Sequence, residues 1–248
     1  MTIRKRNLYK PNSDKPYKLS RSKVESFLNC KRCFFIDRKL GIGQPPGFPF
    51  NINSAVDELL KKEFDQYRKS EKSHPYMAQT GKNLIPFSHK NLNDWRENFK
   101  GVQYFHEETN FLLTGAVDDL WFDLDKNEII VVDYKATSKN SEVTIDADWQ
   151  IGYRRQMDFY QWLIRKNGFQ VSNIGYFVYC NGDKKRDSFE NKIHFDVSVL
   201  EYVGNTKWVE PTLNEIKLLL DQTIVPKTNI DCSYCNYVQN VNSVESVE

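Results

Sequence analysis

The feature that most constrains the fold is a pair of strand-like segments joined by a short turn. Residues 111–122 are rich in apolar and β-branched side chains, residues 124–127 (Leu-Asp-Lys-Asn) have the composition of a turn, and residues 128–135 (Glu-Ile-Ile-Val-Val-Asp-Tyr-Lys) read as a second strand. We expect an antiparallel hairpin centred between Asp125 and Lys126, in which residues whose numbers sum to 251 face each other. This register places Asp118 opposite Asp133, with their Cβ atoms about 5 Å apart.

The charged residues of this hairpin predict a metal-dependent phosphodiesterase. Period-two alternation puts Lys135 on the same face as Asp133. Two carboxylates held together repel each other, and a bridging divalent cation such as Mg²⁺ or Mn²⁺ removes that penalty. Lys135 would orient or help to deprotonate the attacking water and offset charge in the transition state. The alternative is a solvated hairpin with charges that only flank the turn, and we accept that interpretation for Asp123 and Asp125.

These residues and two further segments resemble the PD-(D/E)XK nuclease superfamily. Within it they look like the RecB-type nuclease domain shared with CRISPR-associated adaptation exonucleases. The resemblance is carried in order by residues 19–30 (Leu-Ser-Arg-Ser-Lys-Val-Glu-Ser-Phe-Leu-Asn-Cys), 113–118 (Leu-Thr-Gly-Ala-Val-Asp), 130–137 (Ile-Val-Val-Asp-Tyr-Lys-Ala-Thr) and 156–160 (Gln-Met-Asp-Phe-Tyr). These motifs, together with the last cysteines, extend from about residue 19 to residue 235, which is nearly the whole chain.

The resemblance implies that Asp118 and Asp133 bind metal, that the backbone carbonyl of Tyr134 is a further ligand, and that Lys135 is catalytic. It also implies that Gln156 and Tyr160 form the branch's glutamine and tyrosine motif. Residues 149–167, ended by Gly168, independently predict a helix, on which positions four apart share a face. The alternative is a tyrosine packed in the core and a glutamine that caps a buried backbone group.

The chain departs from the branch at an early helix, where related proteins have a histidine that completes the metal site. The matching segment, residues 53–60, carries Asp57, and none of the four histidines falls there. Helical geometry places Asp57 at the margin of a buried stripe that includes Leu60 and Phe64. An aspartate is an acceptable Mg²⁺ ligand, so we expect Asp57 to replace the histidine. The alternatives are a charge on the helix flank, a first-turn residue that favours the helix dipole, or a site that has lost activity.

Four of the five cysteines form two Cys-x-x-Cys pairs, Cys30 with Cys33 and Cys232 with Cys235. Together they make a complete four-thiolate site, which suits tetrahedral Zn²⁺ or an iron–sulfur cluster. The resemblance implies a [4Fe-4S] cluster that joins the N- and C-terminal segments. Related proteins divide their cysteines one and three, whereas this chain divides them two and two. We expect the cluster, and this departure keeps structural Zn²⁺ as the alternative.

The remaining features bear on location and partners. We find no signal segment and no long apolar span, so we expect a cytoplasmic protein without a membrane partner, and disulfides are disfavoured there. Cys180 lies in an apolar strand and is expected in the core. The net charge is only +2, but the first forty residues carry twelve basic side chains against three acidic ones. That segment could follow a phosphate backbone, or it could be a solvated tail and an exposed helix face.

A chain of 248 residues with 40% hydrophobic content can build one substantial core, and two domains would separate partners of one site. We therefore expect a basic leader (residues 1–18), a single nuclease-like domain (residues 19–239) and a disordered tail (residues 240–248). The fold class is α/β (α+β), with a mixed central sheet flanked by helices as in restriction endonucleases. One helix over residues 20–39 should carry the first cysteine pair.

The predicted function is that of a Mg²⁺- or Mn²⁺-dependent DNA nuclease. The resemblance implies an exonuclease that acts on single-stranded or end-containing DNA in recombination, repair or CRISPR-type adaptation, with a helicase or a recombination or adaptation protein as a possible partner. The first alternative is an inactive nuclease fold that binds DNA ends, which the missing histidine suggests. The second is a zinc-stapled protein-interaction module in which the hairpin charges are incidental.

Overall fold

The computed structural model describes residues 4–45, 47 and 51–245, and the chain forms two compact units. The first unit combines residues 1–48, 104–114 and 207–248, and the second combines residues 49–103 and 115–206. Each unit is thus assembled from segments that are far apart in the sequence. None of the described helices is long and apolar enough to cross a membrane.

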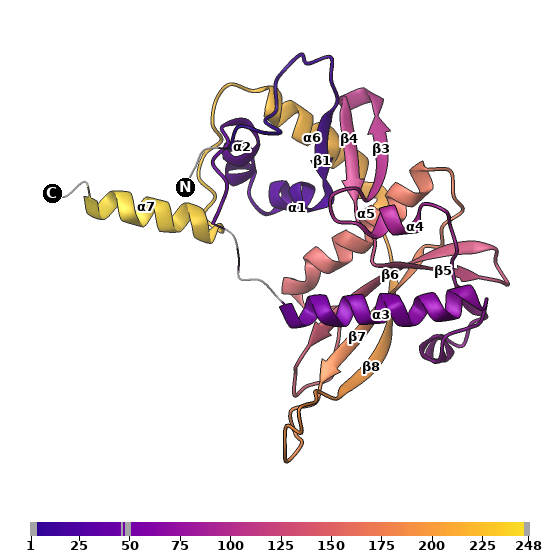
Figure 1. Cartoon of the computed structure of the whole chain (residues 1–248). Coiled ribbons are helices and arrows are strands. Elements are labelled where there is room, and N and C mark those ends of the chain that lie inside the picture. The colour runs from indigo at the N-terminus through magenta and orange to yellow at the C-terminus, as the bar shows by residue number, and fades with distance from the viewer. Residues whose placement is uncertain (1–3, 46, 48–50, 246–248) are drawn as a thin grey trace. The chain divides into compact units, whose positions relative to one another are not determined.

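The second unit is built on a five-stranded mixed sheet with the order β2-β5-β6-β7-β8 (Figure 1). Its strands are β2 (Leu84–Pro86), β5 (Asp119–Asp123), β6 (Glu128–Thr137), β7 (Ile174–Gly182) and β8 (Phe195–Val203). Only β6 and β7 run parallel, because the helix α5 (Ile151–Lys166) connects them as a crossover; the other pairs are antiparallel.

The predicted hairpin register is confirmed in β5 and β6. Asp119 pairs with Val132 and Asp123 pairs with Glu128, so the numbers of paired residues sum to 251 throughout the ladder. A shift of one residue would have exchanged the two faces of β6. The register therefore decides which side chains meet at the end of the hairpin.

Each face of this sheet is covered by a different helix. The long helix α3 (Asn51–Lys69) buries Leu60 and Phe64 against Trp121 and the even-numbered side chains of β6, and the Phe64 and Trp121 rings stack with centroids 5.5 Å apart. Gly175 lies under Met157 of α5 on the other face: a Cβ at this glycine would come within 2.4 Å of the methionine sulfur. Cys180 is buried in the α3-side core, as predicted.

Three short elements follow α3 in the chain: a 3-10 helix, an edge strand and a short helix. The 3-10 helix η1 (Pro75–Thr80) exchanges hydrogen bonds between Gln79 and the backbone of β8, at Val197 and Val199. The edge strand β2 follows it, and the short helix α4 (Leu92–Arg96) precedes the hairpin.

The first unit contains most of a three-stranded sheet with the order β1-β4-β3. The strands are β1 (Tyr17–Ser20), β3 (Val102–His106) and β4 (Phe111–Gly115), of which residues 102, 103 and 115 are assigned to the second unit. The helices of the first unit are α1 (Arg21–Asn29), α2 (Lys31–Lys39), α6 (Val209–Asp221) and α7 (Ser233–Glu245). Strands β1 and β4 are parallel, with Tyr17 opposite Phe111. Helix α6 packs against both α1 and α2. Three more 3-10 turns complete the chain: η2 (Glu107–Thr109), η3 (Asp148–Gln150) and η4 (Thr206–Trp208).

The structure differs from the sequence expectations in three places. The strand expected over residues 111–122 is two strands in different sheets, because residues 116–118 leave the ladder and Val117 bonds to the carbonyl of Trp95 (3.1 Å). The helix expected over residues 20–39 is broken at Cys30, whose backbone is extended so that its sulfur accepts a hydrogen bond from the Cys33 amide. Residues 240–245, expected to be disordered, continue helix α7, which contains no glycine or proline to end it. Residues 246–248 lie outside the described residues.

The predicted fold class is confirmed, with a mixed sheet flanked by helices and a clustered four-cysteine group. The division into leader, single domain and tail stays a prediction.

Candidate functional site

The hairpin brings Asp118 and Asp133 to one end of strand β6. Asp118 lies directly before β5, and its Oδ2 accepts a hydrogen bond from the backbone amide of Tyr134 (2.9 Å). Because Tyr134 follows Asp133, this bond holds the Asp118 carboxylate beside the strand position of Asp133. The arrangement agrees with the register from which the site was predicted.

Lys135 and Gln156 both bind the buried carboxylate of Asp133. The Lys135 ammonium forms an ion pair with Asp133 Oδ2, and the Gln156 side-chain amide donates to Oδ1 (2.8 Å). The Lys135 Nζ also lies 4.7 Å from the centroid of the Tyr153 ring, a contact that the sequence did not predict. Asp133 is therefore held from both sides, by its own strand and by helix α5.

Tyr160 lies one helical turn beyond Gln156 on the same face of α5, and its hydroxyl is 3.3 Å from the Gln156 amide nitrogen. Its ring is buried against Gly115, where a Cβ would come within 2.7 Å of the ring. The glycine of the Gly-Ala-Val-Asp motif thus has a packing role: only a residue without a side chain allows the tyrosine to approach this closely. Gln156 thus contacts β6 through Asp133, whereas Tyr160 packs against the end of β4; the catalytic role of this motif stays a prediction.

Asp57 lies on α3 and is linked to the site by a lysine that the sequence analysis missed. Lys61, one turn further along α3, places its ammonium 2.7 Å from Asp57 Oδ2 and 4.0 Å from Asp118 Oδ1. The signal that could have identified it is the spacing of four residues from Asp57. The N-terminal end of α3 is held to the strand because Asn53 donates to the Ala136 carbonyl (3.1 Å).

The pKa shifts report crowded negative charge. Burial, and then repulsion by Asp118, raise the pKa of Asp57 above its ordinary value. Burial alone would lower the pKa of Lys135, but attraction to Asp133 and Asp118 outweighs it and raises the pKa. Lys135 is therefore a stable ammonium at neutral pH, which suits charge stabilisation and water orientation better than proton abstraction.

A further aspartate, Asp119, which the sequence motifs did not predict, fixes the elements around the site. It is completely buried and binds Arg68 of α3 (2.5 Å), Arg96 of α4 (2.6 Å) and the Tyr134 hydroxyl (2.7 Å). Asp65 binds the same two arginines. This network ties the helix that carries Asp57 to the strand that follows Asp118.

The acidic residues fit a hard divalent cation by their chemistry. Carboxylate oxygens are the ligands that Mg²⁺ and Mn²⁺ prefer. Asp57 Oδ1 is buried and has no hydrogen-bond partner among the described residues, so it can accept a ligand contact without breaking another. In the described part of the chain the three carboxylates do not form a group with ligand atoms within 4.8 Å of one another. Lys61 and Lys135 take the place of a cation between them.

The four paired cysteines form a compact group in which one metal ion could contact every sulfur. The sulfur–sulfur distances are 3.7 Å for Cys30 and Cys235, 3.7 Å for Cys33 and Cys232, and 3.8 Å for Cys33 and Cys235, and all four sulfurs lie within 4.8 Å of one another. None of the four is in a disulfide. Burial raises the pKa of Cys30 and Cys33, whereas at Cys232 burial is outweighed by hydrogen bonds from the Cys235 amide and the neighbouring thiols, which lower the pKa of its thiol. Because thiols bind a metal as thiolates, metal binding at this site would release protons. The predicted four-cysteine site is confirmed.

Much of the basic charge near the N-terminus is already paired inside the first unit. Arg4, Lys23 and Arg38 all bind Asp37, and Lys31 binds Glu215. These contacts reduce the number of cations that remain for a phosphate backbone.

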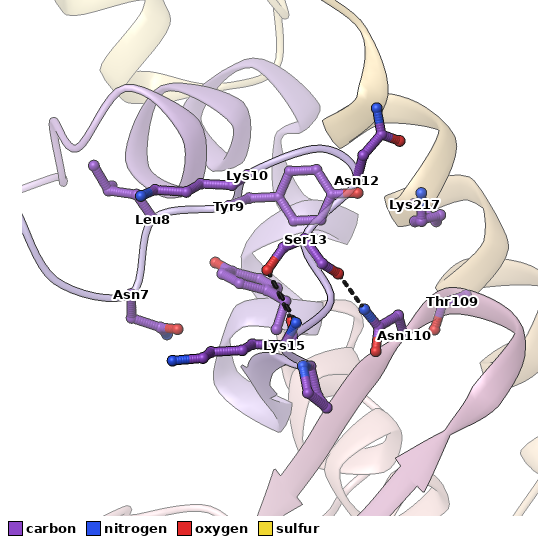
Figure 2. Close-up of a pocket in the computed structure, with 12 residues that line it drawn as sticks. Asn7, Leu8, Tyr9, Lys10, Asn12, Ser13, Lys15, Thr109, Asn110 and Lys217 are labelled. Atoms are coloured by element: carbon purple, nitrogen blue, oxygen red, sulfur yellow. Dashed lines mark hydrogen bonds between the residues drawn. The ribbon is translucent and has the colours of Figure 1, made fainter.

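The leader also forms one wall of a cavity of about 310 Å³ (Figure 2). Figure 2 shows Asn110 bonded to the Ser13 carbonyl (2.8 Å) at its edge, with Lys10, Lys15 and Lys217 around it. The cavity contains none of the predicted site residues, so it gives no independent support to the acidic site.

One comparison with known proteins identifies the family of this chain. A model of the PD-(D/E)XK nuclease superfamily matches residues 43–239. The matched range includes every predicted residue of the acidic site and the second cysteine pair, but not the first. A search of curated proteins finds no match.

Proposed function

Because the chain belongs to the PD-(D/E)XK nuclease superfamily, we propose that it is a Mg²⁺- or Mn²⁺-dependent nuclease that hydrolyses phosphodiester bonds in DNA. The observation that carries the proposal is the convergence of Asp118 and Asp133: one carboxylate binds the Tyr134 amide, and the other binds Lys135 and Gln156. Two carboxylates and an ammonium at one strand end are the groups that metal-assisted hydrolysis requires.

Each residue has a specific role in this proposal. Asp118, Asp133 and Asp57 would hold the cation, with the Tyr134 carbonyl as a further ligand. When bound, the cation would polarise the phosphate and lower the pKa of a water molecule. Lys135 orients that water and offsets the negative charge that builds on the phosphate.

The α5 motif residues position these groups. Gln156 fixes the rotamer of Asp133 through the bond to Oδ1, and Tyr160 supports Gln156 from its buried position against Gly115. A group held in the reactive orientation before substrate binds loses less entropy in the reaction.

For the substrate we propose single-stranded DNA or DNA with free ends, processed in recombination, repair or CRISPR-type adaptation. This part of the proposal is supported by the resemblance of the motifs to the RecB-type branch.

The test is cleavage of end-labelled single-stranded DNA in the presence of Mn²⁺. We expect Asp133→Ala to abolish cleavage while DNA binding persists. Asp125→Ala is the matched control, because Asp125 is an exposed carboxylate in the turn of the same hairpin and should leave cleavage unchanged.

Two other outcomes would support the alternatives. Binding of DNA ends without cleavage in any divalent metal would indicate an inactive end-binding protein. Absence of both DNA binding and divalent-metal binding outside the cysteines would indicate an interaction module.

For the cysteine site we propose a single structural Zn²⁺ in place of the [4Fe-4S] cluster that the resemblance implies. A tetrahedral ion with metal–sulfur bonds of about 2.3 Å has sulfur–sulfur edges of about 3.8 Å, which the distances of 3.7 to 3.8 Å match. A cluster binds each thiolate through a different iron atom, so its sulfurs have to spread around the whole cluster. The compact group of sulfurs therefore favours one ion.

Metal analysis and visible absorption of anaerobically purified protein test the zinc proposal. We expect a colourless protein with one zinc per chain. A brown protein with an absorption band at roughly 400 nm, and iron in place of zinc, would refute it.

A further inference from the structure

We propose that Lys61 is an internal counter-ion of the acidic site, and that it sets how tightly this site binds its divalent cation. This inference rests on the proposed function, because it concerns the same carboxylates. It adds a residue that neither the motifs nor the family match assigned.

The contacts of Lys61 distinguish it from an ordinary surface lysine. Its ammonium lies 2.7 Å from Asp57 Oδ2 on its own helix and 4.0 Å from Asp118 Oδ1 on the hairpin, and its side chain is only 20% exposed. A lysine that pairs only within a helix contributes little to stability. Lys61 instead binds two carboxylates from different elements, as a metal ion would.

Helix α3 contains a second lysine–carboxylate pair, Lys62 with Glu58, with which the pair of Lys61 and Asp57 can be compared. Lys62 pairs with Glu58 at 2.6 Å with the same spacing of four residues, but their side chains are 64% and 69% exposed. Solvent screens that pair, and among the described residues Lys62 forms no ion pair with a second carboxylate. Any effect that belongs to helix pairing in general should therefore appear equally at Lys61 and Lys62.

The charge of the site explains why a second lysine is useful. Asp57, Asp118 and Asp133 carry three negative charges, and Lys61 and Lys135 carry two positive ones, which leaves one net negative charge. One bound divalent cation would change the net charge of the site from −1 to +1, which complements the single negative charge of a phosphodiester. A second divalent cation would raise the net charge to +3. Lys61 cancels the charge that Asp57 contributes to the site. We therefore assign one divalent cation to this site.

The experiment compares Mn²⁺ binding by the zinc-loaded full chain and three variants, measured by isothermal titration calorimetry without DNA. We expect one Mn²⁺ per chain in the unchanged protein. Lys61→Met should bind Mn²⁺ at least about tenfold more tightly, because the competing ammonium is gone. Lys61→Arg keeps the charge and should stay within about threefold of the unchanged protein. Lys62→Met is the matched control and should show no change.

A second measurement separates this role from a merely structural one. Lys61→Met should lower the melting temperature of the zinc-loaded protein measured without Mn²⁺, because the carboxylates of the acidic site are no longer neutralised. Mn²⁺ should then raise the melting temperature of this variant more than that of the unchanged protein. If the role of Lys61 were purely structural, the substitution would lower the melting temperature by the same amount without Mn²⁺ and with Mn²⁺.

The outcomes distinguish failure of this inference from failure of the proposed function. If the unchanged protein binds Mn²⁺ and cleaves DNA, but Lys61→Met binds Mn²⁺ with the same affinity as the unchanged protein, Lys61 is not a counter-ion. Binding of two Mn²⁺ ions with cleavage intact would overturn the single-cation assignment. If no Mn²⁺ binds and no DNA is cleaved, the proposed function and this inference both fail.

Discussion

The neighbouring residues Asp118 and Asp119 are the most direct test of how the site is built, because their carboxylates have different surroundings. Asp119 is completely buried between Arg68, Arg96 and the Tyr134 hydroxyl, whereas the Asp118 side chain is 23% exposed and is bound by the Tyr134 amide. We predict that Asp119→Asn mainly destabilises the protein and that Asp118→Asn mainly removes activity.

The magnitude for Asp119→Asn follows from the network. Replacement of the carboxylate by an amide keeps the shape but leaves two buried guanidinium groups with only Asp65 as a charged partner. Breaking a buried charge pair from one side costs about 3–5 kcal/mol. The Asp65 contacts place this change at the lower end, about 3 kcal/mol, which for a chain of this size lowers the melting temperature by roughly 6–12 °C.

Asp118→Asn should behave differently. The amide oxygen can still accept the Tyr134 hydrogen bond, and the loss of one negative charge relieves repulsion with Asp57. Stability should therefore change by less than about 1 kcal/mol. Mn²⁺-dependent cleavage should fall by about a hundredfold or more, because a charged ligand is lost.

Thermal and urea unfolding followed by circular dichroism, together with a single-turnover cleavage assay, check both variants. A free energy of unfolding for Asp119→Asn within about 1 kcal/mol of that of the unchanged protein would contradict the predicted role of Asp119. Normal DNA cleavage by Asp118→Asn would contradict the predicted role of Asp118.

Three further predictions concern the supporting groups. Gln156→Leu removes the hydrogen bond to Asp133 and should slow single-turnover cleavage about tenfold with little change in stability; an unchanged rate would contradict its positioning role. Gly115→Ala forces a Cβ against Tyr160 and should cost about 1–3 kcal/mol in urea unfolding, whereas Gly47→Ala, with no atom within 4 Å of the added Cβ, should cost far less. Cys232→Ser should abolish zinc binding and lower the melting temperature; retained stoichiometric zinc would argue against the four-cysteine ligand set.

The register of the hairpin was predictable because its determinants are local. The apolar run of residues 129–132 and the turn at residues 124–127 allow one pairing that buries the right side chains, and the structure has that pairing. The motif residues of α5 were placed correctly for the same reason, since a helix puts Gln156 and Tyr160 on one face without any knowledge of the rest of the chain.

The errors arise where distant segments meet. The strand expected over residues 111–122 divides between two sheets because β4 pairs with β1, a segment almost one hundred residues earlier. The break at Cys30 depends on the cysteine group, whose other half is more than two hundred residues later. Neither partner leaves a signal in the local pattern.

The superfamily was identified from the resemblance of its motifs and is shown by the family match. The mixed α/β class, the hairpin register and the four-cysteine group were predictable from short-range periodicity and cysteine spacing. Which charges neutralise one another depends instead on contacts between elements that the local pattern does not contain. Lys61, Asp119 and the two buried arginines act through contacts between elements, and the energy of a buried charge depends on the partners that folding brings within a few ångströms, not on the residues beside it in the chain.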